Sequence, residues 1–231
     1  MACLSGLNHH SLIPMPYRRT ENVVRRLAAR ERTILAAATS IAGEGGMSAV
    51  QIAAVAERAG IAAGTVYRYF PSKSDLVRDL VAAVAEHDIA AMRAAADAAP
   101  GPLSALAAAI FAFAAGSIAK RRLTWAVIGE AVDPEVDAAR LGFRNALRAE
   151  LAARIRAAIA GGHLPDQDVA LAAAAVLGAL VEGLISPRAA TAGSDDGNAL
   201  AAAQSAALLA LRALGVIDAR ARGLVAQCKM P

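Results

Sequence analysis

The sequence predicts an all-α protein of nine helices in two domains, and three observations support this fold class. Hydrophobic residues make up 57% of the 231 positions, and aromatic residues only 3%. Alanine, the strongest helix former, accounts for about a quarter of the chain, whereas strands favour aromatic and β-branched side chains. Apolar residues also recur every three to four positions along most of the chain. The composition therefore excludes a β-sandwich or barrel, and it excludes disorder throughout.

The N-terminal part is expected to contain a flexible basic arm over residues 1–27 and four helices. The four helices are predicted over residues 22–42, 51–58, 62–70 and 73–97. Glycines at positions 43, 45 and 46 end the first helix, and Gly60 separates the second from the third. Pro71 ends the third helix, and Ser72 with Asp75 has the capping-box spacing for the fourth.

The C-terminal part is expected to contain five more helices. They are predicted over residues 103–119, 121–132, 134–160, 168–185 and 199–214. Asp133, Pro134 and Glu135 form a helix-start signal, since a capping acid precedes proline and a second acid near the positive end of the helix dipole. Asp168 is expected to cap the helix that follows it.

The longest uncharged window, residues 98–119, raises the question of a membrane span. It is mostly alanine and opens with Pro100, Gly101 and Pro102, so we expect a buried helix after a turn. Cys3 and Cys228 lie near opposite ends of the chain, which is typical of a reduced, cytoplasmic protein.

The positive charge is concentrated in the first third of the sequence. Residues 1–80 hold ten basic and six acidic side chains, whereas the other 151 residues hold equal numbers of each. Six arginines lie between Arg18 and Arg32. Clustered cations attract a polyanion because its counterions are released, although a solvated basic helix face remains an alternative.

The spacing of small residues over 51–70 predicts a helix-turn-helix. Ala56 lies four residues before Gly60, where the two helices cross and a larger side chain would separate them. Gly60 supplies the left-handed backbone of the turn, while Val55, Ile61 and Val66 fill the core beneath.

The segment that follows carries a family signature. Its ten residues 64–73 read GTVYRYFPSK, and AERAG stands at residues 56–60. This pattern resembles the signature of the tetracycline-repressor (TetR) family of bacterial transcription regulators, over about residues 28–88. The resemblance implies a DNA-binding domain at 28–88 and an effector-binding and dimerisation domain at 89–231.

The resemblance also implies that helix 62–69 enters the major groove of operator DNA. Thr65 and Arg68 would reach phosphates or base edges, Tyr67 and Tyr69 phosphates, and Lys73 a backbone phosphate. The positions expected at the DNA are Gln51, Ala62, Ala63, Gly64, Thr65, Tyr67, Arg68, Tyr69 and Lys73. Arg18 and Arg19 either contact DNA as well or are solvated.

Two positions depart from the family pattern. Gln51 and Ala62 stand where the family often has serine or threonine, which puts side-chain capping of both helices in doubt. Ala62, Ala63 and Gly64 offer small apolar contacts only. Phe70 is expected in the core rather than at the DNA.

The same resemblance predicts a homodimer that releases a palindromic operator when a small effector binds. Helices 168–185 and 199–214 are expected to form the dimer contact, since they are rich in small apolar residues. Ile110, Phe111, Phe113, Trp125 and Phe143 are expected to line the pocket, with plain core as the alternative for each. The scarcity of charge between 98 and 119 favours an apolar or aromatic effector.

No catalytic signature stands in the sequence, and we expect neither an enzyme nor a metal or cofactor. The motifs sought include G-x-S-x-G, a phosphate-binding loop and H-E-x-x-H. His87 and His163 are isolated and read as surface or loop residues. Two other functions stay open: a nonspecific polyanion or membrane-surface binder, and a helical small-molecule carrier with a degenerate DNA-binding domain.

Overall fold

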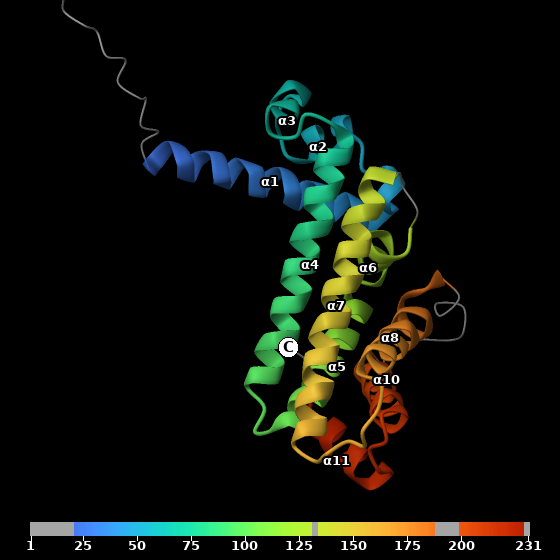
Figure 1. Ribbon diagram of the computed structural model, residues 1–231. Coiled ribbons are helices and arrows are strands. Elements are labelled where there is room, and N and C mark those ends of the chain that lie inside the picture. Colours follow the sequence, from blue (N-terminus) through green and yellow to red (C-terminus); the bar gives the residue numbers. More distant parts are fainter. Residues whose placement is uncertain (1–20, 131–133, 188–198, 229–231) are drawn as a thin grey trace, which may run out of the picture.

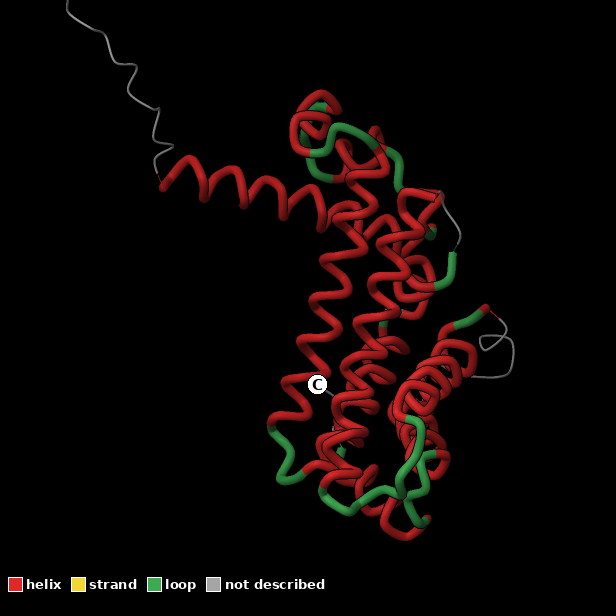
Figure 2. The backbone as a smooth tube through the Cα atoms, in the orientation of Figure 1, coloured by secondary structure: helices red, strands yellow, loops and turns green. Residues whose placement is uncertain are grey.

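The computed structural model describes residues 21–130, 134–187 and 199–228, and this part of the chain folds into helices without a strand. Figure 1 shows a small group of helices at one end of the molecule and a larger bundle of long helices below it. The smooth tube of Figure 2 makes the same division visible in the connecting loops. The all-α, two-domain prediction is confirmed.

The N-terminal group contains four helices and one short 3-10 turn. They are α1 (Glu21–Gly45), η1 (Met47–Ala49), α2 (Ile52–Arg58), α3 (Ala63–Tyr69) and α4 (Lys73–Asp97). Residues 21–27, which the sequence places in the basic arm, form the first turns of α1. Residues 1–20 lie outside the described part, so the rest of the arm stays a prediction.

The bundle contains the remaining helices. They are α5 (Pro102–Ala119), α6 (Arg121–Ile128), α7 (Pro134–Ala160), α8 (Val169–Leu180), the π-helical turn η2 (Val181–Ile185), α10 (Ala199–Ala213) and α11 (Asp218–Gln227). The predicted helices 103–119, 168–185 and 199–214 are confirmed to within a few residues. The predicted helix-start acid, Asp133, lies outside the described residues.

Two expectations about the bundle are wrong in detail. The predicted helix 121–132 stops at Ile128, because the amides of Gly129 and Glu130 both turn back to the carbonyl of Trp125. The described residues contain ten α-helices rather than nine, because α11 follows the predicted last helix. The sequence signal for α11 is weak, since its buried anchors are Ala221 and Val225 alone.

The uncharged helix α5 is the centre of the bundle. It packs against α4, α7 and α10, and Leu106, Ala109 and Ile110 are fully buried. It is the single helix among the described residues that is long and apolar enough to cross a membrane, and most of it is buried inside the protein. Its length and apolar character therefore fit a core helix, as predicted.

Helix α4 joins the two parts of the molecule. Its first turn follows α3, and the helix then runs the length of the bundle against α5 and α7 (Figure 1). The predicted capping box begins it: the Ser72 hydroxyl accepts from the amide of Asp75, whose carboxylate accepts from the amide of Ser72. Asp168 caps α8 as predicted, by accepting from the amides of Ala170 and Leu171.

A buried ion-pair network fastens the far half of α4 to α7. Glu150 of α7 is only 6% exposed and accepts from Arg93 of α4 at 2.8 Å and from Arg154 at 2.8 Å. Arg154 also reaches Asp97 at the end of α4 at 3.2 Å. Burial alone would raise the pKa of Glu150, but the two arginine hydrogen bonds outweigh it and hold the pKa below its usual value.

Candidate nucleic-acid interface and ligand cavity

The predicted helix-turn-helix is formed by α2 and α3. Gly60 has φ 65°, in the left-handed region, and the amide of Ile61 then donates to the carbonyl of Ala56 at 3.0 Å. Ala56, Val55 and Val66 are buried between the helices, and Ile61 is partly buried beside them. The turn therefore has the residues and the geometry that its sequence predicts.

Helix α3 lies at the end of the molecule with one face in solvent (Figure 1). Ala62, Ala63 and Gly64 at its start are exposed, as is Arg68 at its end. Tyr67 is 52% exposed, although tyrosine has a large apolar ring. These residues form one surface that a nucleic acid can approach, and the small side chains at the start permit close contact.

The remaining positions around α3 divide between surface and core. Thr65, Tyr69 and Lys73 are half-buried, and Tyr69 packs against the core with its ring. Phe70 is buried, which confirms its expected role in the core. The structure thus brings every residue predicted on α3 to the surface or to its edge.

Gln51 and Ala62 stand just before α2 and α3, where a capping side chain is often found. Neither of them makes a side-chain capping bond. The side-chain amide of Gln51 instead donates to the carbonyl of Ser48 at 2.9 Å. Gln51 is exposed and lies at the end of α2 nearest to η1.

The charges near the helix-turn-helix are of two kinds. Arg58 and Arg78 are paired with carboxylates of their own chain, Arg58 with Glu44 at 2.7 Å and Arg78 with Asp75 at 2.8 Å. The hydrogen bonds from Arg58 and Ser40 lower the pKa of Glu44 to about 2. Arg68 and Lys73 make no such ion pair within the described part of the chain, which leaves their charge for a partner.

More basic side chains stand along the first half of α1. This part of the helix extends away from the body of the molecule, and Arg26, Arg30 and Arg32 on it are exposed (Figure 1). Together with Arg68 and Lys73 they give the N-terminal part an excess of accessible positive charge. The candidate arm residues Arg18 and Arg19 lie outside the described residues.

A clamp of two side chains ties the bundle to the segment just before the helix-turn-helix. Arg122 of α6 pairs with Glu130 and donates to the carbonyl of Gly45 at 3.0 Å. Glu130 in turn accepts from the amide of Met47 at 2.8 Å. Because residues 45–47 connect α1 to α2, this Arg122–Glu130 clamp couples α6 mechanically to the helix-turn-helix.

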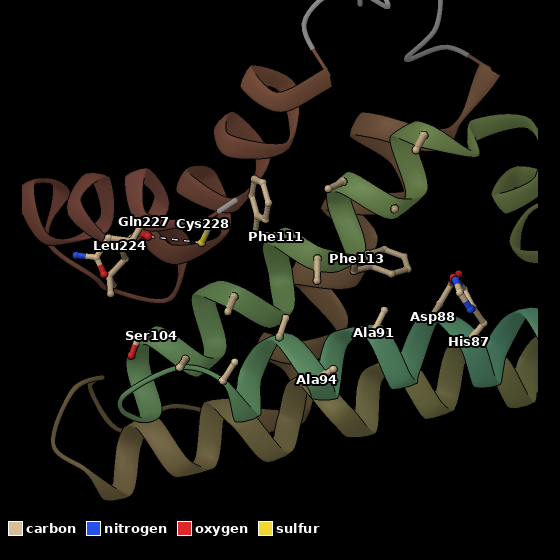
Figure 3. Close-up of a pocket in the computed structure, with 18 of the residues that line it drawn as sticks. His87, Asp88, Ala91, Ala94, Ser104, Phe111, Phe113, Leu224, Gln227 and Cys228 are labelled. Carbon is tan, nitrogen blue, oxygen red and sulfur yellow. Dashed lines mark hydrogen bonds between the residues drawn. The ribbon is translucent and has the colours of Figure 1, made fainter. Parts of the chain in front are cut away.

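The bundle contains a cavity of about 760 Å³ between α4 and α5, with the end of α11 on its third side (Figure 3). Its walls are largely alanine side chains of α4 and α5, with Phe111 and Phe113. His87, Asp88 and Lys120 are its acidic and basic residues. Burial raises the pKa of Asp88, while the charge of Lys120 and the nearby His87 act in the opposite direction.

Of the five residues predicted for an effector pocket, Phe111 and Phe113 line this cavity. Ile110 and Phe143 are buried in the core elsewhere, and Trp125 is partly buried and lies over Gly129. Ile110 lies on the side of α5 that packs into the bundle, and Trp125 and Phe143 belong to α6 and α7, which contribute no residue to the lining.

Sequence reasoning missed most of the lining. His87 reads as an ordinary surface histidine in isolation, and Leu224, Gln227 and Cys228 belong to or follow the helix that was not predicted. A signal for the α4 wall does exist. Directly after His87 and Asp88, alanines recur at helical spacing at positions 91, 94, 95 and 98.

The helices expected at a dimer contact carry an apolar outer face. Leu171 of α8 is 67% exposed, and Leu200 and Leu209 of α10 are 43% and 59% exposed. Between Leu171 and Glu182, the exposed positions of α8 are alanines. Large exposed apolar side chains next to small ones are typical of a helix face that packs against a partner.

Comparison with known proteins agrees with this geometry. Residues 34–80 match the family described as bacterial regulatory proteins, tetR family. Over 48 residues the chain is 58% identical to the HTH-type transcriptional repressor KstR of Mycolicibacterium smegmatis. That match covers 21% of the chain and 24% of KstR, so the chain spans about a quarter of the length of this relative.

Solved structures are similar over most of the chain. RolR in complex with resorcinol superposes with a TM-score of 0.64 at 21% identity, covering 90% of the chain and 98% of RolR. FadR from Bacillus subtilis in complex with stearoyl-CoA gives a TM-score of 0.68 at 20% identity, covering 80% of the chain and 98% of FadR. At these identities the likeness shows a shared fold.

Proposed function

Since the chain belongs to the TetR family of bacterial regulatory proteins through its N-terminal domain, we propose that it is a DNA-binding transcriptional repressor. The observation that carries the proposal is the exposed face of α3, which presents Tyr67 and Arg68, with Lys73 following at the start of α4. Arg68 reads a base edge, and Tyr67 with Lys73 holds the phosphate backbone. A location in the cytoplasm follows from this target.

The protein acts as a homodimer on a palindromic operator. Two copies of α3 then enter successive major grooves, since a twofold dimer places identical elements on the two half-sites. The apolar outer face of α8 and α10 supports a contact through these helices, in which Leu171 and Leu209 are the most exposed leucines.

A small apolar or aromatic effector releases the operator. The cavity between α4 and α5 supports this step, because its volume suits a small organic molecule and α4 also leads directly to α3. A ligand that displaces α4 changes the spacing of the two α3 helices in the dimer, and hence the fit to DNA.

A footprint tests the proposal. The purified protein is added at physiological salt to the DNA upstream of its own coding region, and one palindromic segment is expected to be protected. The variant carrying Tyr67→Ala and Lys73→Ala is expected to lose this protection. Arg156→Ala, which removes an exposed charge from α7, is the matched control and keeps it.

Two results contradict the proposal. One is an unchanged footprint with the double variant, which would mean that another surface binds the DNA. The other is equal retardation of unrelated DNA fragments with no protected segment, which identifies a nonspecific polyanion binder instead.

A further inference from the structure

The polarity of the cavity between α4 and α5 is uneven along its length. His87 and Asp88 lie close to Phe113 at one end, and Ser104 and Gln227 lie at the other (Figure 3). Lys120 belongs to the first end, because its Nζ is 3.2 Å from Nε2 of His87. The acidic and basic lining residues are therefore at one end, Cys228 lies on the side of Leu224 and Gln227, and the walls between the ends are largely apolar.

The charges at this polar end are of both signs. Lys120 donates one hydrogen bond to His87, and its ammonium group has further N–H groups that can donate to a ligand. Asp88 offers carboxylate oxygens that can accept a hydrogen bond. Asp88 is only partly exposed, and the structure gives its carboxylate no hydrogen bond within the described residues. The polar end can thus both accept a hydrogen bond from a ligand and donate one to it.

This mixed pair discriminates between ligand head groups. A carboxylate is attracted by Lys120 and repelled by Asp88, and an ammonium group meets the reverse. Either ion also leaves one net charge in a mostly apolar cavity, where an unbalanced charge is costly. A hydroxyl group donates to Asp88 and accepts from Lys120 without adding a charge.

The apolar walls set the size of the rest of the ligand. The lining of α4 runs from Asp88 to Ala98, a length of about 15 Å by the helical rise, which suits a chain of about ten carbon atoms. Alanines of α5 face them, so the space between the helices stays open along this length. A ligand of a single ring would leave much of the 760 Å³ unfilled.

We propose that the cavity binds an elongated apolar molecule with a neutral hydroxyl group at one end, held between Asp88 and Lys120. The inference rests on the proposed function in that it names the chemistry of the effector. The tail of the ligand lies along the alanine walls toward Ser104 and Gln227.

The polar end also lies where a signal can leave the cavity. His87, Asp88 and Lys120 border a second, smaller cavity of about 240 Å³, which reaches Thr39 of α1 and Leu123 of α6. A hydroxyl that accepts from a further N–H of Lys120 draws the ammonium group toward the ligand and so shifts its 3.2 Å contact with His87 on α4. The head of the ligand therefore acts at the point where α1, α4 and α6 meet.

Calorimetric titration of the full-length protein with three probes of equal chain length tests the inference. The probes are decan-1-ol, decanoic acid and decylamine, each kept below its aggregation concentration. Decan-1-ol is expected to bind about tenfold more tightly than either of the other two, which corresponds to one charge-related hydrogen bond gained or lost.

Two variants make the test specific. Asp88→Asn is expected to raise the affinity for decanoate relative to decan-1-ol, and Lys120→Gln to raise that for decylamine. Ser104→Ala, at the far end of the cavity, is the control and leaves the ratios unchanged. Each ratio is measured within one variant, so a partly unfolded preparation does not alter it.

The inference is overturned if decanoate or decylamine matches decan-1-ol on the natural protein, if none of the three binds, or if the two variants leave the ratios unchanged. Failure of the proposed function has a different signature. Decan-1-ol would then bind with the predicted selectivity while the operator footprint was absent or unaffected by it.

Discussion

Gly46 and Gly60 both adopt a positive φ, 78° and 65°, yet their surroundings differ. A Cβ at Gly60 would meet no atom within 4 Å, so its glycine serves the backbone of the turn alone. A Cβ at Gly46 would lie 2.0 Å from the guanidinium of Arg122. At position 46 the glycine also leaves space for the Arg122 side chain, which donates to the carbonyl of Gly45 and pairs with Glu130.

Alanine substitutions separate these two roles. Gly60→Ala is expected to cost about 1–2 kcal/mol of unfolding free energy, the price of a left-handed alanine. Gly46→Ala is expected to cost about 1 kcal/mol more, because Arg122 must also give up its hydrogen bonds. Chemical denaturation measures both values. In an Arg122→Ala background the extra cost of Gly46→Ala should shrink to what the contact of the new Cβ with the Glu130 carboxylate requires. Equal costs already in the natural background would contradict this account.

Glu150 makes the stability of the protein depend on pH in a defined direction. Its pKa is lowered in the folded state from the ordinary 4.5, so its contribution is complete above pH 4.5 and is lost as the pH falls through the folded-state value. Glu150→Gln is expected to destabilise the protein by about 1–3 kcal/mol at pH 7. Denaturation at several pH values should show this difference shrinking below pH 4.5.

The exposed Glu31→Gln on α1 is the control for this measurement. It should change the stability little at any pH. A Glu150→Gln penalty that stayed constant from pH 7 down to pH 3 would show that the carboxylate charge contributes nothing.

At the scale of elements, the features predicted correctly from the sequence are those that depend on residues close together in the chain. The turn at Gly60, the cap at Ser72 and the burial of Phe70 each depend on neighbours within a few residues. The cavity depends on contacts distant in sequence, since α11 meets α5 across more than a hundred residues. The buried face of α11 is small, and alanines at helical spacing do not show by themselves whether they pack closely or line a space, so α11 and the cavity were not predicted.

The Arg122–Glu130 clamp is the element-scale link between bundle and helix-turn-helix. Glu130→Ala removes the acceptor of the Met47 amide and the partner of Arg122. Local opening of the segment after α1 should become easier by about 1–2 kcal/mol, or roughly five- to thirtyfold. Hydrogen exchange of the amides at 46–50 measures this change.

Glu86→Ala, an exposed acid on α4, is the matched control for the clamp. Its exchange pattern at 46–50 should equal that of the natural protein. If Glu130→Ala behaved in the same way, the clamp would have no mechanical role.

At the scale of the whole molecule, the proposed dimer contact rests on the apolar outer face of α8 and α10. Sedimentation at micromolar concentration is expected to give a dimer for the natural protein. Leu171→Asp combined with Leu209→Asp should weaken association by about a hundredfold or more, because two apolar side chains of this face become charged. Leu141→Asp, at another exposed leucine on α7, should leave the dimer intact. A monomeric natural protein would contradict the assembly.

The whole arrangement, with basic α1, exposed α3 and a cavity that α4 connects to them, fits the proposed ligand-controlled DNA-binding regulator. The proposed DNA contacts are of two different kinds. Arg68 is free to meet a base edge, and Lys73 stands at the first turn of α4, where a phosphate is favoured.

The most direct test is therefore the affinity for every single-base variant of the footprinted operator, measured for the natural protein, Arg68→Ala and Lys73→Ala. Arg68→Ala should abolish the preference at one base pair of each half-site, worth about 1–3 kcal/mol, and leave the other preferences in place. Lys73→Ala should weaken binding to all sequences alike and reduce the salt dependence by about one ion. Unchanged affinities and preferences in both variants would contradict the assignment of α3 as the DNA-reading helix.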